Sequence, residues 1–172
     1  MIGSVKAWVF LLAVLFGGIG AVCRFLVDTG VKNAMKRRYG VAGKPTARLR
    51  HLMDRWPKFE FLGTIPMGTM VVNLSACLLV GLVAGIFGSL LAGLPAASAA
   101  SAAAAHVQGL SEARYILSTG FLGGYSTFST ASVEGYRLFE SGHPLKGLGH
   151  AGGMLVGSLL LVALGFALGS LA

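Results

Sequence analysis

Residues 120–130 read GFLGGYSTFST and lie at the centre of an apolar run over about residues 112–139. Two adjacent glycines are followed by four hydroxyl residues in five positions, and a glycine inside a helix costs about 1 kcal/mol relative to alanine. In a bilayer, each unpaired backbone group costs several kcal/mol. The stretch therefore predicts a transmembrane helix that is broken near its middle and whose freed backbone groups are satisfied by another group.

Two explanations fit such a break. The freed carbonyls of broken membrane helices commonly coordinate ions. Alternatively, serine and threonine hydroxyls can bond back to the backbone and stabilise a simple kink. The residues alone do not separate an ion site from a kink.

Three further apolar runs are long enough to cross a bilayer, which takes about 20 residues. They cover about residues 5–27, 62–93 and 148–171, so the chain is predicted to be a single all-α integral membrane domain, residues 1–172, with four transmembrane helices. The composition agrees, because 55% of the residues are hydrophobic and only 12% are charged. An Ala-rich segment, residues 96–105, is predicted to be a loop or a weak helix.

The positive charge is concentrated between the first two runs. The formal net charge is +8, and nine of the 14 Lys and Arg residues lie in a basic loop, residues 28–61. With four spans, this loop shares one side of the membrane with the connection between the third and fourth spans. That side holds eleven Lys and Arg residues, against two on the side of the termini. The positive-inside rule therefore predicts termini outside and the basic loop in the cytoplasm, near anionic lipid, with no nucleic-acid partner.

A few polar or charged side chains fall inside the apolar runs. Asn73 lies midway along the second run and offers two donors and one acceptor, either to an ion or to a neighbouring helix. Charged side chains inside a bilayer are energetically unfavourable, so Arg24 and Glu134 mark functional positions by default. The alternative is that such charges snorkel to the interface, above all Arg137. Glu134 is placed to line a vestibule.

Sequence signatures of catalysis do not occur. The chain has no HExxH, GxSxG or P-loop pattern, and no two carboxylates are spaced for acid–base work. The histidines, His51, His106, His143 and His150, lie in or near predicted loops without the spacing of metal ligands. The chain is therefore not expected to be an enzyme.

Three of the runs carry motifs whose order and spacing agree with one known family. The motifs are GGIGA at 17–21 followed by Arg24, then Pro66, GTMVVN at 68–73 and Gly81, and finally GFLGGYSTFST at 120–130 with Glu134. Together they resemble the CrcB/Fluc family of fluoride channels, and the third motif is the most specific of them. The basic loop and the Ala-rich segment lie outside the resemblance.

The resemblance implies a channel subunit in the plasma (inner) membrane that exports fluoride passively and lowers its cytoplasmic concentration. Family members are antiparallel dimers of four-helix subunits, with two fluoride paths along the interface. The broken third helices cross at the centre, where backbone carbonyls hold a structural sodium ion. By position, those carbonyls here belong to Gly123 and Ser126, and Arg24 takes a structural role.

The fluoride path of the family maps onto Asn73, Phe128, Ser129 and Thr130, with Glu134 near an entrance. Fluoride is small and strongly hydrated, so a dry path must replace its water with hydrogen-bond donors. The amide and hydroxyl groups of these residues can donate, and a phenylalanine can turn the positive edge of its ring toward an anion. A sodium ion would add positive charge near the path.

One position departs from the family pattern, which has a second phenylalanine where this chain has Ala131. Some family members work as two unlike subunits, in which one chain can lose residues of the path. A strong charge bias also opposes two orientations of a single chain. We therefore expect that this chain pairs with a related subunit of opposite orientation.

Two other functions fit a small four-span chain. A proton-coupled exporter of the antiparallel type needs a carboxylate in the middle of its first helix, and this first run has none before Asp28. The second is a structural membrane protein that conducts nothing. In such a protein no bound ion would compensate the energetic cost of the broken helix in the third run.

Overall fold

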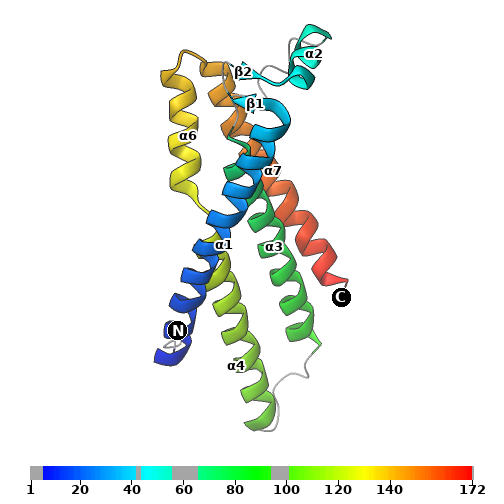
Figure 1. Cartoon of the computed structure of the whole chain (residues 1–172). Helices are drawn as coiled ribbons and strands as arrows, with labels where there is room; N and C mark the ends of the chain where they lie inside the picture. The colour runs from blue at the N-terminus through cyan, green and yellow to red at the C-terminus, as the bar shows by residue number, and fades with distance from the viewer. Residues whose placement is uncertain (1–5, 42–43, 56–65, 94–100, 172) are drawn as a thin grey trace.

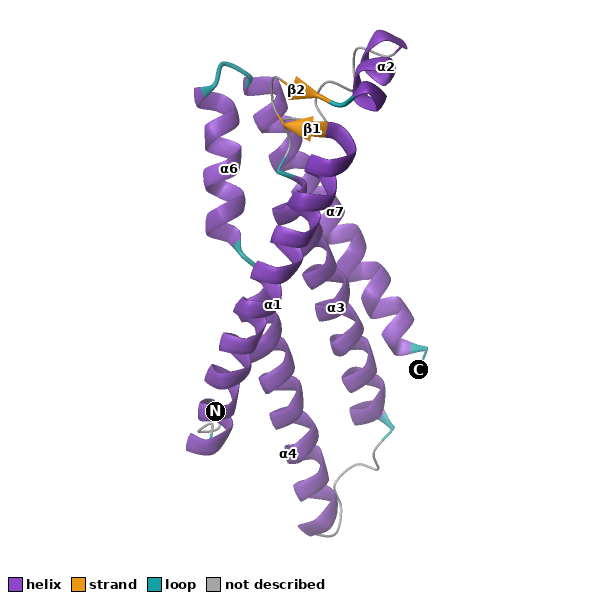
Figure 2. Cartoon of the chain, viewed as in Figure 1, coloured by secondary structure: helices purple, strands orange, loops and turns teal. Residues whose placement is uncertain are grey.

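The computed structural model describes residues 6–41, 44–55, 66–93 and 101–171, and these are almost entirely helical (Figure 1, Figure 2). A pair of two-residue antiparallel strands, with Gly40 opposite Pro45, follows the first helix. In chain order the elements are α1 (Ala7–Tyr39), β1 (Gly40–Val41), β2 (Lys44–Pro45), α2 (Ala47–Arg55), α3 (Met67–Ala92), α4 (Ser101–Tyr115), the π-helix η2 (Ile116–Leu122), α5 (Gly123–Tyr125), α6 (Phe128–Glu140) and α7 (Pro144–Ser170).

Three helices, α1, α3 and α7, are long and apolar enough to cross a membrane. They correspond to the first, second and fourth predicted runs. The third predicted run, residues 112–139, is divided among α4, η2, α5 and α6 and follows a bent helical path.

The helices run up and down along one axis of the molecule. As Figure 1 shows, α1 and the path from α4 to α6 run toward the end that carries α2 and the α6–α7 turn. In the opposite direction, α3 and α7 run back toward the end where both termini lie. This arrangement places the basic segment and the α6–α7 turn at one end, as the order of the apolar runs predicts.

The first helix extends well beyond its predicted end. The basic loop was predicted to begin at residue 28, but α1 continues to Tyr39 with Lys36, Arg37 and Arg38 in its last turn. Lysine and arginine are good helix formers, and at a helix C-terminus their charge interacts favourably with the helix dipole. The residue after the last one of α1, Gly40, is the C-cap, and its φ of 89° is one that glycine adopts readily.

Part of the Ala-rich segment is helical. The residues from Ser101 onward begin α4, because alanine is the strongest helix former. Residues 96–100 of that segment lie outside the described residues, as do the predicted first residues of the second span, 62–65.

Glycines bring α3 and α7 into backbone contact. A Cβ atom at Gly81 would collide with the carbonyl of Val162, and one at Gly165 would collide with the carbonyl of Leu78. Small residues at such crossings let membrane helices approach closely, where van der Waals packing replaces the hydrophobic effect as the attraction.

The glycine motif of α1 packs against the glycines of the bent segment. A Cβ at Gly20 would collide with the carbonyl of Phe121, and one at Gly124 with the carbonyl of Gly17. The two motifs that stand about a hundred residues apart in sequence are therefore the two sides of one helix crossing, which fixes the position of the bend.

Large apolar side chains cover the outside of α1 and α7. Those exposed by about half or more include Phe10, Leu11, Val14, Leu15, Val22, Phe25, Leu26, Leu148, Leu155, Leu159, Leu160 and Phe166. An apolar surface this continuous is unfavourable in water and suits lipid or another subunit.

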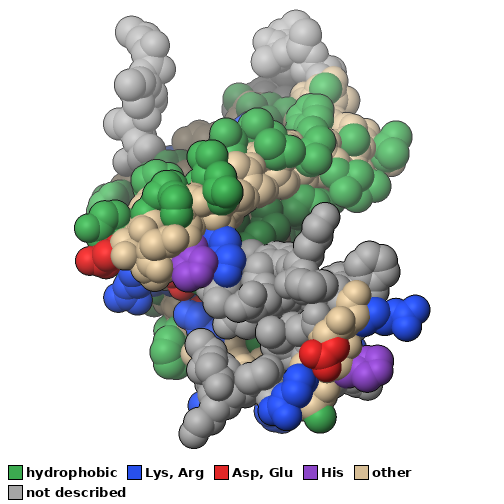
Figure 3. All heavy atoms as spheres, turned by 90° about the horizontal axis from the view of Figure 1, so that it is seen from above, with side chains coloured by type: hydrophobic (Ala, Val, Ile, Leu, Met, Phe, Trp, Pro, Cys, Tyr) green, Lys and Arg blue, Asp and Glu red, His purple; other side chains and the backbone are tan. Residues whose placement is uncertain are grey.

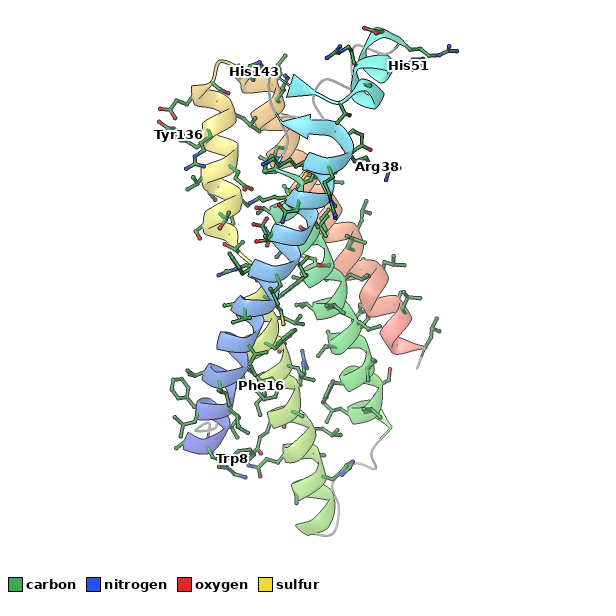
Figure 4. All side chains as sticks on the ribbon, in the orientation of Figure 1. Trp8, Phe16, Arg38, His51, Tyr136 and His143 are labelled. Atoms are coloured by element: carbon green, nitrogen blue, oxygen red, sulfur yellow. The ribbon has the colours of Figure 1, made fainter. Side chains whose placement is uncertain are left out.

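The two ends of the molecule differ in chemistry. Figure 3 looks onto the end opposite the termini, where Lys and Arg side chains gather, and Figure 4 labels Arg38, His51 and His143 at that end. At the other end Trp8 is half-exposed, and the Lys6 ammonium lies 5.8 Å from the centre of its ring. Basic residues at one end and an interfacial tryptophan at the other are typical of a membrane protein.

Candidate functional site

The bent segment leaves the helical conformation at two residues. Ser126 has ψ 161° and Thr127 has φ −150° and ψ 112°, so both are extended, and α6 begins at Phe128. Before this point the chain is a π-helix, η2, and the single turn α5. An extended pair inside a helical path frees backbone groups that a continuous helix would have paired.

Asn73 of α3 pairs with the freed backbone of Thr127. Its Nδ2 donates to the Thr127 carbonyl at 2.8 Å, and the Thr127 N–H donates to Asn73 Oδ1 at 2.8 Å. The side-chain amide thus acts as a second peptide group beside the extended residue. Asn73 is buried, and one of its two N–H donors is left after these bonds. The hydrogen bond to a neighbouring helix, one of the two predicted roles of Asn73, is therefore present.

Arg24 of α1 contacts the other extended residue. Its Nη1 donates to the Ser126 carbonyl at 3.3 Å. The bend is therefore held from two sides, by α1 at Ser126 and by α3 at Thr127. Snorkelling does not describe Arg24, because its guanidinium is bonded to the backbone of the bend.

Thr127 also begins α6 as its N-cap. Its Oγ1 accepts from the Thr130 N–H at 3.3 Å and donates to Thr130 Oγ1 at 3.0 Å. Sequence reasoning did not single out this residue, although a threonine just before a new helical run is a recognised N-cap signal. The serine and threonine hydroxyls here do bond locally, as the kink interpretation predicts.

Tyr125 anchors the residues before the bend. Its hydroxyl lies 2.9 Å from Ser75 Oγ, and its ring joins the buried cluster of Val72 and Ala76. Sequence reasoning missed this residue too, since nothing in the local pattern shows that its hydroxyl meets a serine of α3.

Two hollows flank the Asn73–Thr127 pair, and Thr127 lines both. The larger is a groove of about 460 Å³ between α3, α6 and α7, whose lining includes Asn73, Phe128 and His150. The smaller, about 130 Å³, lies on the α1 side and is lined by Arg24 and Thr130 among others. An ion that passes the bend would therefore meet polar groups on either side of one hydrogen-bonded pair.

The predicted path residues of α6 gather at its first turn. Phe128 is 87% exposed and lines the larger groove together with Ala131, the position where the family pattern has phenylalanine. Ser129 is exposed, with its Oγ 3.4 Å from Thr127 Oγ1, and Thr130 lines the smaller hollow. Asn73, Phe128, Ser129 and Thr130 are thus brought together around one turn.

The two predicted carbonyl ligands lie on either side of Gly124 and Tyr125. A continuous helix would direct the Thr127 N–H to the Gly123 carbonyl, but this N–H goes to Asn73 instead, which frees the Gly123 carbonyl from its usual donor. The Ser126 carbonyl already accepts from Arg24 and retains one lone pair. Among the described residues no group of three or more His, Cys, Asp or Glu residues could hold a metal ion.

Glu134 belongs to a charged group between α1 and α6. Its Oε1 lies 3.8 Å from Lys32 Nζ, which in turn lies 2.7 Å from Asp28 Oδ2. The other carboxylate oxygens, Asp28 Oδ1 and Glu134 Oε2, are buried without a hydrogen-bond partner in the described part of the chain. Lys32 thus offsets part of the negative charge beside the smaller hollow.

His150 is a residue of the groove that was not among the predicted site residues. It was described as lying in or near a loop, at the start of the predicted fourth span, and it lies in the second turn of α7, is 3% exposed and lines the larger groove. The signal for it was helical spacing, because His150, Met154 and Ser158 recur every four residues and all line the groove.

Comparisons with known proteins agree on one family. The family model described as CrcB-like protein, Camphor Resistance (CrcB), matches residues 11–166. The fluoride-specific ion channel FluC of Chloroflexus aurantiacus is 35% identical over 124 residues, 72% of this chain and 85% of that protein. FluC 2 of Cutibacterium acnes is 32% identical over 91% of this chain and 93% of its own length. FluC 1 of Frankia casuarinae is 39% identical over 74% of this chain and 87% of its own length.

Proposed function

Because this chain belongs to the CrcB-like protein family, we propose that it is a subunit of a fluoride-selective channel that exports fluoride passively and lowers its cytoplasmic concentration. The relatives that carry the name fluoride-specific ion channel cover most of the chain. The observation that carries the proposal in this molecule is the Asn73–Thr127 pair, which holds an extended stretch between two hollows.

The chain is a multi-pass membrane protein of the plasma membrane, and it is a channel subunit and not an enzyme. In addition to α1, α3 and α7, the path from α4 to α6 makes the fourth crossing, with its bend inside the bilayer. The basic end faces the cytoplasm by the positive-inside rule. Family membership favours a channel over both the proton-coupled exporter and the non-conducting structural protein.

The residues at the bend can replace the water around fluoride. The remaining N–H of Asn73 and the hydroxyls of Ser129 and Thr130 are donors, and the exposed Phe128 can present its ring edge. Without such donors the cost would be on the order of tens of kcal/mol, because an anion loses its hydration on entering a dry path. Fluoride accepts hydrogen bonds more strongly than chloride, so a path of donors favours it.

The exposed side of α6 needs a second subunit to close the path. Phe128 is 87% exposed and Tyr136 is 64% exposed, beside hydroxyl groups that lipid would not satisfy. An antiparallel partner would cover them. The charge bias between the two ends favours a related subunit of opposite orientation over a second copy of this chain.

A sodium ion fits the carbonyls at the bend. The freed carbonyl of Gly123 and the remaining lone pair of Ser126 are oxygen donors, the kind that hard cations prefer. The same pair from a partner subunit would complete a set of four. Bound sodium would offset the repulsion among carbonyls and add positive charge beside the path, while Arg24 limits how close it lies to Ser126.

The test of the proposal is fluoride release from liposomes. The purified chain is reconstituted alone and with the candidate partner subunit, and a fluoride electrode records efflux when a potassium ionophore supplies the balancing charge. We expect fast release of fluoride, slow release of chloride, and no effect of a proton uncoupler. Release that an uncoupler abolishes would favour the exporter. No release with or without the partner would contradict the channel.

A further inference from the structure

His150 is buried without a hydrogen-bond partner. Its side chain is 3% exposed, and neither Nδ1 nor Nε2 has a partner among the described residues. Buried polar groups in proteins are nearly always hydrogen-bonded, and an unsatisfied one costs about 1–3 kcal/mol. A histidine left in this state on the wall of a groove is suited to a ligand that occupies the groove.

The groove places this imidazole beside the residues of the proposed path. Phe128 and the hydroxyl residues Ser132 and Ser158 line the same hollow as His150. The lining is otherwise mostly apolar, so few other groups there can stabilise a charged guest.

The charged and titratable neighbours come from every helix packed around it. On α6, Glu134 lies close enough to act electrostatically on His150, and it is tied to Lys32 of α1 at 3.8 Å. On α3 the titratable residue of the groove is Cys77, and on α7 Lys146 lies one turn before His150. Burial of the ring and the two lysines oppose a charged imidazolium, while the Glu134 carboxylate favours it.

The charge of the imidazole decides what it can bind. A neutral ring offers one donor and one acceptor, whereas the imidazolium offers two donors and a positive charge. An anion is attracted only by the second form. The ring lies six residues after Pro144, about 9 Å along the helix from the α6–α7 turn.

We propose that His150 binds fluoride in the larger groove as the imidazolium, which makes passage of fluoride along α6 and α7 depend on pH. The inference rests on the proposed function. It identifies the imidazole of His150 as the group in the groove whose binding of fluoride depends on protonation. Binding of the proton and binding of fluoride then strengthen each other by the same factor. Fluoride flux therefore rises as the pH falls and His150 becomes charged.

The flux test compares liposomes at about pH 5 and about pH 8, because a buried ring is harder to charge than an exposed histidine. Protein-free liposomes at each pH correct for passive loss of HF. We expect wild-type flux to be several-fold higher at the lower pH, and His150→Gln to show no such difference. His143→Gln is the matched control, since His143 lies in the α6–α7 turn and bonds the Ser141 carbonyl at 3.0 Å. An unchanged pH ratio in His150→Gln overturns the proposal.

A second measurement separates failure of this inference from failure of the proposed function. The protonation of His150 is followed by NMR of ¹⁵N-labelled histidine in sodium fluoride and in sodium chloride. We expect its midpoint at higher pH in fluoride, and equal midpoints in the two salts would contradict the proposal. If the wild-type protein releases no fluoride at either pH, the channel function fails, and the NMR titration alone still decides whether His150 binds the anion.

Discussion

Asn73 supports the bend and also lines the larger groove. Its amide donates one hydrogen bond to the backbone of Thr127 and accepts another from it, at 2.8 Å each. One N–H of the amide is then left for an ion. The two predicted roles, a contact with an ion and a bond to a neighbouring helix, therefore do not exclude each other. The side chain that supports the extended residue also lines the larger groove.

Asn73→Asp should damage both roles. The carboxylate keeps the size of the amide but cannot donate to the Thr127 carbonyl, and it adds negative charge on an anion path. An unsatisfied buried group costs about 1–3 kcal/mol, so we expect the apparent melting temperature to fall by several degrees and fluoride flux to fall about tenfold or more. Asn33→Asp, the same change at an exposed position of α1, should alter neither measurement. Full flux in Asn73→Asp would show that the side chain is not part of the path.

The residue scale is also where sequence reasoning reached its limit. Asn73, Phe128, Ser129 and Thr130 could be named from motif and polarity, and the structure gathers them at one turn. The partners could not be named. Whether an amide in α3 faces the carbonyl of Thr127 depends on how two helices approach each other, and no local pattern encodes that distance.

Among the secondary-structure elements, the bend is the point where α5 ends and α6 begins. Residue Thr127 caps α6 while Tyr125 anchors the turn before it to Ser75 of α3. Asn73, Arg24 and the cap bond several of the groups that the extended residues free, whereas the Gly123 carbonyl has lost its usual donor. These contacts explain how the predicted break is stabilised.

Thr127→Ala should weaken the start of α6. Loss of an N-cap hydroxyl typically costs about 1 kcal/mol, so we expect the apparent melting temperature to fall by about 2–4 °C, with Thr127→Ser restoring most of it. Thermal unfolding in detergent measures the change. Ser129→Ala, which removes a neighbouring hydroxyl that does not cap the helix, serves as the control. Equal losses in Thr127→Ala and Ser129→Ala would argue against the capping role.

The crossing of α1 with the bent segment leaves no room for a side chain. A Cβ at Gly124 would collide with the carbonyl of Gly17, whereas one at Gly18 would meet nothing within 4 Å. We expect Gly124→Ala to lower the melting temperature and the yield of folded protein, and Gly18→Ala to be neutral or slightly stabilising. Chromatography and thermal unfolding test the pair, and a Gly124→Ala protein as stable as Gly18→Ala would contradict the observed crossing.

At the element scale the sequence predicted which segments are helical better than where they end. The extension of α1 to Tyr39 was missed because a run of Lys and Arg was taken as a loop on the evidence of charge alone. These residues are good helix formers. The apolar core of the membrane sets the length of the membrane-spanning part, but the helix can continue beyond it.

The whole molecule is asymmetric in charge along its long axis. Basic side chains lie at the end opposite the termini, and Trp8 lies at the end near them (Figure 4). This asymmetry predicts one orientation in the membrane, whereas a homodimer of antiparallel copies would need two. Pairing with a related subunit of opposite orientation would reconcile the asymmetry with the proposed antiparallel dimer.

Cysteine labelling in intact cells should reveal a single orientation. In a parent chain whose Cys23 and Cys77 are replaced by alanine, Arg55→Cys should react with a membrane-impermeant reagent only after the cells are opened. Ser170→Cys should react from outside. The cysteine-free parent is the control. Labelling of both positions from outside to equal extents would show two orientations and favour a dimer of identical chains.

The most direct test of the account measures fluoride release from liposomes that carry the wild-type chain with its partner, Phe128→Ile, or Phe10→Ile. Both phenylalanines are exposed, at 87% and 55%, but only Phe128 lines the groove beside the bend. We predict that Phe128→Ile loses at least about tenfold in flux, about 1.4 kcal/mol at the barrier, without a change in melting temperature. Phe10→Ile should conduct fluoride, and exclude chloride, as the wild type does. Wild-type flux through Phe128→Ile would contradict the claim that fluoride passes this groove.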